Sequence, residues 1–259
     1  MKDCIVIQTG GLRRRSRKVG FQWAQFLCVA LTALILFAGV ATADEAHSKW
    51  LPEPPNLGDL QERVLAYKNS GSYEHDLAAV AAKAEAYLLS HLHDGHKPAL
   101  VLDIDETSLS NWPQIVANGF GYIPSGSCSR LPKGPCGARA WELMAGAPVI
   151  APTLDLFRAA RAKGVSVFFI TGRDESERKA TIKNLQRAGY SGWTRLIMRP
   201  EGSSTPSAAD YKAPQRAKIA GQGYTIIVNM GDQPSDLAGG NPDSRERQFL
   251  LPDPFYRIP

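Results

Sequence analysis

Short apolar runs alternate with amphipathic segments from about residue 60 to residue 228. Apolar runs of about four to eight residues are typical of buried strands, whereas apolar residues spaced three and four apart are typical of helices. The pattern predicts strands at residues 99–102, 165–170, 195–198 and 224–228. It predicts helices at residues 60–67, 73–92, 153–162, 175–188 and 212–221. Repeated strand–helix units predict an α/β fold, a three-layer Rossmann-like parallel sheet with right-handed crossovers.

Two stretches fall outside this alternation. Residues 44–58 become Pro-rich toward their end and are predicted to be an N-terminal arm before the main domain at residues 59–259. Residues 112–150 show no clear periodicity and contain many Gly, Pro and aromatic residues. Long irregular insertions in a compact domain are usually functional, often as lids. We therefore expect residues 112–150 to form a small cap.

The positive charge of the chain is confined to its beginning. The formal net charge is +5, but residues 1–43 hold six basic side chains and one acidic one, which leaves 24 of each in the remainder. A neutral body gives no support for binding a nucleic-acid polymer through a basic surface.

The first 43 residues have the features of a secretory signal peptide. Basic residues at 13–18 precede a 15-residue apolar run at 26–40, and Ala41-Thr42-Ala43 is a small-x-small cleavage site. We expect cleavage near Ala43 and export to the periplasm or the medium. The alternative is a retained anchor, but a span usually needs about 20 apolar residues. Membrane contact is expected only through this segment if it stays uncleaved.

Two groups of possible metal ligands have simpler explanations. Cys128 and Cys136 lie in a Gly- and Pro-rich loop, and export favours a disulfide between them. Zinc would need two more ligands there. His91, His93 and His96 could bind a metal, but no constellation of acids or Cys accompanies them, which favours the polar end of a helix.

Polar residues follow three of the predicted strands. They are Asp103 and Asp105, Thr171 and Gly172, and Asp232 and Asp236, with Lys212 opening a predicted helix. Side chains alternate along a strand, so the first two acids should share one side. Taken singly, each residue could be a helix cap, a turn or a solvated helix start. Together they predict a site at the strand ends, where open α/β sheets bind ligands.

This set of groups fits phosphoryl transfer. A carboxylate can attack phosphorus and form an acyl phosphate. A second acid two residues later can protonate the leaving oxygen and afterwards activate water. Magnesium prefers oxygen ligands, which Asp103 and Asp232 could supply. The Thr171 hydroxyl, Gly amides and Lys212 would balance the charge of the phosphoryl oxygens.

Four motifs in order strengthen this interpretation. Asp-Ile-Asp-Glu-Thr, Phe-Phe-Ile-Thr-Gly-Arg, Tyr-Lys and Gly-Asp-Gln-Pro-Ser-Asp resemble the motifs of the haloacid dehalogenase superfamily. The closer resemblance is to its acid phosphatases (class B, subfamily IIIB), which include bacterial lipoprotein acid phosphatases and plant vegetative storage proteins. It covers about residues 50–259. The order and spacing of four motifs is a specific signal, whereas any single one would be weak.

The resemblance implies roles for these residues. Asp103 would be the nucleophile and Asp105 the general acid and base, while Thr171, Gly172 and Lys212 would bind the phosphate of a small phosphomonoester. The fold would be the haloacid dehalogenase fold with residues 112–150 as its cap. Because the cap has its own sequence and no lipoprotein Cys is present, the resemblance does not extend to substrate preference or anchoring.

The resemblance also implies a magnesium cofactor. Asp103, Asp232 and the backbone carbonyl of Asp105 would hold Mg²⁺, and Asp236 would support the metal shell or Lys212.

Other activities of the superfamily stay open as alternatives. An acid two residues after the nucleophile is missing from its dehalogenases and transport ATPases, so Asp105 favours a phosphatase or a phosphomutase. Export and a small cap favour the phosphatase. A non-catalytic storage or binding protein is the alternative from another class, and loss of the nucleophile would mark it.

Aromatic residues in the cap bear on the substrate. Trp112, Phe120, Tyr122 and Trp141 could hold an aromatic leaving group, such as the base of a 5′-nucleotide, or could be the small core of the cap itself.

Overall fold

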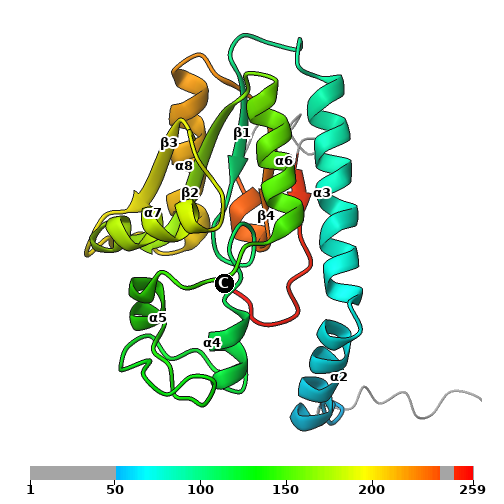
Figure 1. Cartoon of the computed structure of the whole chain (residues 1–259), viewed down its shortest axis with the longest axis vertical. Coiled ribbons are helices and arrows are strands. Elements are labelled where there is room, and N and C mark those ends of the chain that lie inside the picture. The colour runs from blue at the N-terminus through cyan, green and yellow to red at the C-terminus, as the bar shows by residue number, and fades with distance from the viewer. Residues whose placement is uncertain (1–50, 240–247, 259) are drawn as a thin grey trace, which may run out of the picture. The chain divides into compact units, whose positions relative to one another are not determined.

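The computed structural model describes residues 51–239 and 248–258, so the predicted signal peptide, its cleavage site and residues 44–50 of the arm lie outside the described residues. A compact unit begins at Pro55. Five parallel strands form its sheet, in the order β3-β2-β1-β4-β5 (Figure 1). They are β1 Pro98–Leu102, β2 Ser166–Asp174, β3 Arg195–Arg199, β4 Thr225–Gly231 and β5 Gln248–Leu250. The predicted α/β fold with a parallel sheet is confirmed.

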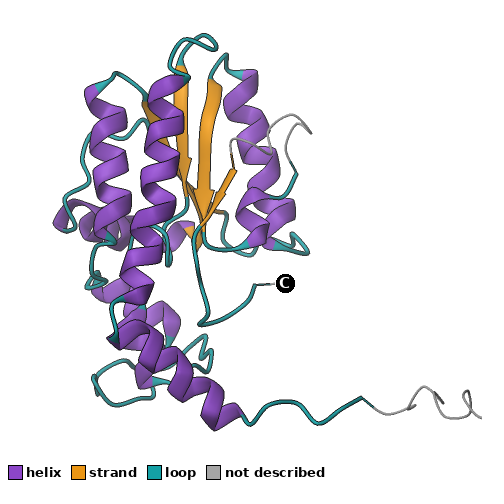
Figure 2. Ribbon diagram, turned by 90° about the vertical axis from the view of Figure 1, so that its right-hand side faces the viewer, coloured by secondary structure: helices purple, strands orange, loops and turns teal. Residues whose placement is uncertain are grey.

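Helices lie on both faces of this sheet (Figure 2). Leu100 and Leu102 of β1 point into a core shared with α3 (Ser72–Ser90) and α6 (Ala151–Ala162). The alternating residues Ala99 and Val101 pack instead against α8 (Ala208–Gly221). Both sides of β1 are buried, which explains why its sequence is apolar throughout rather than alternating.

Several boundaries differ from the sequence prediction, and two of these differences bear on the predicted site residues. β2 continues past Ile170 to Asp174, because after an irregularity Asp174 pairs with Arg199 of β3. α8 begins at Ala208, where Ser207 caps the helix by accepting a hydrogen bond from the Asp210 amide. Lys212 therefore lies inside this helix and does not open it.

Residues 112–150, which are predicted to form the cap, contain two short helices that the sequence pattern did not predict. They are α4 (Trp112–Ala117) and α5 (Ala138–Met144), and Figure 1 shows them together beyond one end of the sheet. A disulfide joins Cys128 to Cys136 in the loop between them. The Asn118 side chain, which follows α4, both accepts from the Cys136 amide at 2.8 Å and donates to its carbonyl at 2.9 Å. The disulfide is thereby tied to the end of α4.

The remaining elements are short or lie at the edge. They are α2 (Leu57–Asn69), the 3₁₀ helix η1 (Glu175–Glu177), α7 (Arg178–Arg187) and α9 (Pro234–Leu237). The sequence analysis also missed β5, whose three residues are too few for any periodicity and which is held by pairing with β4. Of the helices that the structure describes, none has the length and apolar character needed to cross a membrane.

Candidate active site

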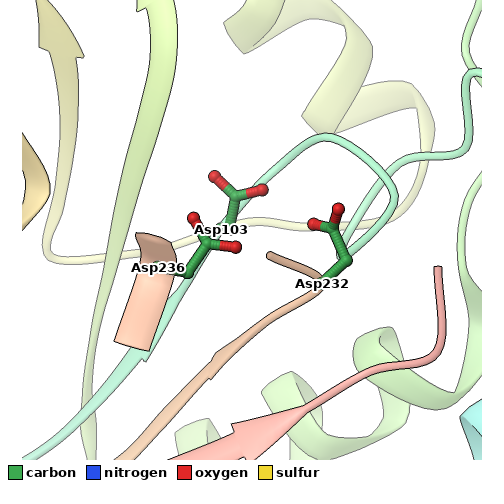
Figure 3. Close-up of side chains that lie close together, drawn as sticks. All are labelled: Asp103, Asp232 and Asp236. Atoms are coloured by element: carbon green, nitrogen blue, oxygen red, sulfur yellow. The ribbon is translucent and has the colours of Figure 1, made fainter. Parts of the chain in front are cut away.

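Two of the predicted acids lie at the ends of neighbouring strands. Asp103 follows β1 directly, and its amide donates to the carbonyl of Met230 in β4 at 3.1 Å. Asp232 follows β4, so the strand pairing brings the two acids to one edge of the sheet. Both are buried. Figure 3 shows these carboxylates together with that of Asp236 from α9, and the three offer oxygens that lie within 4.8 Å of one another.

A buried lysine bridges two of these acids. Lys212 reaches in from α8, and its Nζ donates to Asp103 Oδ1 and to Asp236 Oδ1, each at 2.5 Å. Burial alone would lower the pKa of Lys212, but the attraction of both carboxylates outweighs it and raises the pKa, so the ammonium stays charged. Asp236 also accepts from the Gln233 amide at 2.9 Å, which fixes the carboxylate that steadies Lys212.

The charge balance of this cluster calls for a further cation. Three buried carboxylates face one ammonium, which leaves two negative charges uncompensated when all are ionised. Burial, followed by the repulsion of Asp103 and Asp236, raises the pKa of Asp232 well above its ordinary value. Burial raises the pKa of Asp103 to about 7, although Lys212 opposes this. Carboxylate oxygens so placed fit a divalent hard cation, which would lower both pKa values.

Thr171 and Gly172 lie at the same edge of the sheet, on β2, which neighbours β1. Thr171 is fully buried, and its Oγ1 accepts from the amide of Arg173 at 3.1 Å. Gly172 is exposed, and a side chain at this position would meet nothing within 4 Å. Open space beside a backbone at a strand end is what an incoming anion needs.

Asp105 has a different environment from Asp103. β1 ends at Leu102, so strand alternation does not extend to Asp105, and the argument that placed both acids on one side does not hold. The Asp105 carboxylate is bound by Arg173, with Nη2 at 2.7 Å from Oδ1 and Nε at 3.1 Å from Oδ2. Burial alone would raise the pKa of Asp105, but Arg173 and then Asn111 lower it below the ordinary value.

The comparisons with known proteins place the chain in a family. The model of the haloacid dehalogenase superfamily, subfamily IIIB (acid phosphatase), matches residues 41–259. The chain belongs to this family. The predicted superfamily, fold and enzyme class are therefore confirmed, and the chain is a phosphomonoesterase of the acid phosphatase type.

Relatives of this phosphatase include proteins named as acid phosphatases and as a plant glycoprotein. It is 31% identical over 212 residues to acid phosphatase 1 of Solanum lycopersicum, covering 82% of this chain and 78% of the relative. It is 32% identical over 235 residues to the stem 28 kDa glycoprotein of Glycine max, covering 88% and 86%. A solved class C acid phosphatase from Bacillus anthracis matches with a TM-score of 0.61 and 25% identity, covering 78% of this chain and 86% of that one.

Three cap aromatics that were candidates for a substrate site are packed against other side chains. The Trp112 ring lies 6.1 Å from Phe120 and 5.1 Å from Phe255, and Trp141 is only 5% exposed. Tyr122, in contrast, is 78% exposed. Trp112 and Phe120 are half-buried, so Tyr122 is the most exposed ring of the four.

The histidines at residues 91–96 do not form a metal site in the part of the chain that the structure describes, where Asp103, Asp232 and Asp236 are the one suitable group. The His91 ring stacks on the Tyr87 ring, with centroids 3.9 Å apart. Its Nδ1 also makes a hydrogen bond to the backbone carbonyl of Tyr87. His91 is the residue that follows the last turn of α3, so this segment begins at the end of a helix.

Several residues of the site were missed by the sequence analysis. Arg173 binds Asp105, Thr107 Oγ1 donates to Asp232 at 2.9 Å, and Gln233 Nε2 bridges Asp232 at 2.8 Å and Asp253 at 2.6 Å. Arg173 carried a signal, because an Arg two residues after a buried Thr needs an acidic partner inside. The contacts from Thr107 to Asp232 and from Gln233 to Asp253 join distant parts of the chain and leave no local pattern.

Proposed function

We propose that this acid phosphatase is exported and hydrolyses small phosphomonoesters with the help of Mg²⁺, through an aspartyl-phosphate on Asp103. The observation that carries the proposal is the buried cluster of Asp103, Asp232 and Asp236 around Lys212, at the edge of the sheet where ligands bind. Asp103, Asp232 and the carbonyl of Asp105 would hold the ion. When bound, it would offset the repulsion between the Asp103 carboxylate and the phosphate.

The side chains of the site would divide the reaction between them. One carboxylate oxygen of Asp103 attacks phosphorus, and the bond to the leaving oxygen breaks. Lys212 holds Asp103 in place and carries positive charge beside the phosphoryl group. Thr171 and Gly172 bind phosphoryl oxygens from the neighbouring strand.

Asp105 would act as the general acid and the general base. It gives a proton to the leaving oxygen in the first step and takes one from the attacking water in the second. Its contact with Arg173 keeps the carboxylate fixed between these steps. The second step regenerates Asp103 and releases inorganic phosphate.

A purely storage role has support only from relatives. Proteins named vegetative storage proteins match this chain, one from Arabidopsis thaliana at 30% identity over 209 residues. Asp103 stands at the position of the nucleophile, Lys212 donates to Asp103 and Asp236, and Asp232 offers an oxygen within 4.8 Å of theirs. A complete set of this kind favours catalysis.

Chelation tests the metal. We expect exhaustive treatment with EDTA to lower phosphatase activity about 100-fold, in line with the several kcal/mol that a metal supplies to such a transition state. Added Mg²⁺ should restore the activity, and circular dichroism should show that the fold is intact throughout. Full activity in metal-free buffer would contradict the proposed role of Asp232.

The substrate is proposed to be a nucleoside or aryl monophosphate, and Tyr122 is the residue to test. Stacking of a base on one aromatic ring is worth about 1–3 kcal/mol, so Tyr122→Ala should raise KM for a 5′-nucleotide about 5-fold or more. KM for glycerol phosphate should not change. Trp112→Phe is the matched aromatic control, since its ring packs within the protein. Equal changes for both substrates in Tyr122→Ala would exclude stacking.

Export is proposed from the order of features in residues 1–43 and from relatives named as glycoproteins. N-terminal sequencing of the protein from the producing cells should find a chain that begins near Asp44. A chain that retains its apolar run in the membrane fraction would support the anchor instead.

A further inference from the structure

A chain of two hydrogen bonds joins the cap to Asp105. The indole Nε1 of Trp141, in α5, donates to Asn111 Oδ1 at 2.8 Å, and Asn111 Nδ2 donates to Asp105 Oδ1 at 2.8 Å. An indole N–H can only donate, so it obliges the Asn111 oxygen to face Trp141. The Asn111 amide nitrogen then necessarily faces Asp105. The cap thus sets the orientation of a side chain that binds the proposed acid.

The backbone of Asn111 is fixed independently of this chain of hydrogen bonds. Its amide donates to the carboxylate of Glu106, which is fully buried in the loop after β1. Glu106 is held in turn by the Tyr73 hydroxyl of α3 at 3.3 Å. A change at Trp141 is therefore expected to turn the Asn111 amide group without displacing its backbone.

The two oxygens of Asp105 are left with unequal roles. Oδ1 accepts from Arg173 Nη2 at 2.7 Å, from Asn111 at 2.8 Å and from Arg173 Nε at 3.2 Å. Oδ2 has one partner within the described part of the chain, Arg173 Nε at 3.1 Å. Oδ1 is saturated with donors, whereas Oδ2 has capacity left to carry a proton or to accept one from water.

We propose that Asn111 and Trp141 are positioning residues, which hold Asp105 so that Oδ2 is the oxygen that exchanges protons with the leaving group and with water. Arg173 supplies the fixed contact from β2, and Asn111 supplies the contact that depends on where α5 lies. The inference rests on the proposed function, in which Asp105 is the acid and base.

Loss of the indole N–H should therefore affect proton transfer more than substrate binding. In Trp141→Phe the Asn111 amide is free to turn its oxygen toward the carboxylate, which removes one donor and adds repulsion. We expect the rate of phosphorylation to fall about tenfold for an alkyl phosphate, the usual effect of losing one hydrogen bond to a charged group. For 4-nitrophenyl phosphate, whose leaving group departs as a stable anion, the fall should be about twofold at most. KM should stay the same for both.

The test compares Trp141→Phe and Asn111→Ala with Trp112→Phe in burst kinetics on glycerol phosphate and 4-nitrophenyl phosphate. Trp112→Phe makes the same substitution in the same cap, at a ring that packs on Phe120 and Phe255. The first two variants should shift the ratio of the two rates, and the control should not. Because the two contacts act in series, the double variant should lose no more than Asn111→Ala alone.

Two results would overturn the inference in distinguishable ways. Equal losses for both substrates, or a change in KM alone, would mean that Trp141 and Asn111 only support the cap. Asn111 is half-buried, so Asn111→Ala decides the question if Trp141→Phe unfolds. Asp105→Asn is measured in the same assay. If its loss in phosphorylation rate is the same for both leaving groups, Asp105 is not the general acid. The inference about Asn111 and Trp141 then fails together with the proposed function.

Discussion

Asp103→Asn is expected to reduce phosphatase activity to background while the domain stays folded. An amide has the shape of a carboxylate but cannot attack phosphorus, so no acyl phosphate forms. Lys212 can still donate to the amide oxygen in the place of Asp103 Oδ1. Because burial raises the pKa of Asp103 to about 7, its charge is unfavourable in the folded protein, and removing it should leave the midpoint of thermal unfolding unchanged or slightly higher without metal.

The control for this variant is Asp155→Asn, the same substitution on the exposed side of α6. It should retain full activity. A burst of product from Asp103→Asn, in protein shown by mass spectrometry to be free of deamidation, would contradict the assignment of the nucleophile.

Asp105→Asn should slow phosphorylation by about 10² to 10⁴ for an alkyl leaving group, the usual range for general acid catalysis. The fall should be smaller for 4-nitrophenyl phosphate, which needs no proton as it departs. The variant should also be less stable, because the buried guanidinium of Arg173 loses its anionic partner. The Asp105 side chain is 23% exposed, so about 1–3 kcal/mol is expected rather than the full cost of an isolated buried charge.

The pH dependence of this step follows from the same contact. Arg173 and Asn111 lower the pKa of Asp105, so at neutral pH the free enzyme holds it ionised and only a small fraction carries the proton that the first step needs. That fraction grows as pH falls. The phosphorylation rate for an alkyl phosphate should therefore rise toward acid pH in the wild type, and Asp105→Asn should lose this rise. An unchanged acid limb in the variant would assign the proton to another group.

The sequence was sufficient to predict that the candidate site residues follow buried strands, but not the contacts among them. The apolar run before Asp103 and the one before Asp232 each marked a buried strand, and an acid at a strand end is visible in the sequence alone. That these two strands are neighbours depends on the order β3-β2-β1-β4-β5, which is set by the helices that cross over between them. The motif resemblance supplied what periodicity could not.

The ion pair between Asp105 and Arg173 could not be predicted from the sequence either. Alternation applies only within a strand, and β1 ends at Leu102, so the loop that follows turns Asp105 toward Arg173. The contacts of Asn111 and Trp141 join residues 30 positions apart in a segment without periodicity. Hydrogen bonds of this kind depend on how the cap folds back, and no local pattern in the sequence records them.

The most direct test of the account is to identify the residue that becomes phosphorylated. Enzyme mixed with substrate and Mg²⁺ is quenched in acid within the burst phase, and borohydride is added to reduce any acyl phosphate to an alcohol. Peptide mapping then locates the reduced residue. The account predicts homoserine in place of Asp103, formed only when substrate is present. A reduced acid at Asp105, Asp232 or Asp236, or phosphate retained on another type of side chain, would contradict it.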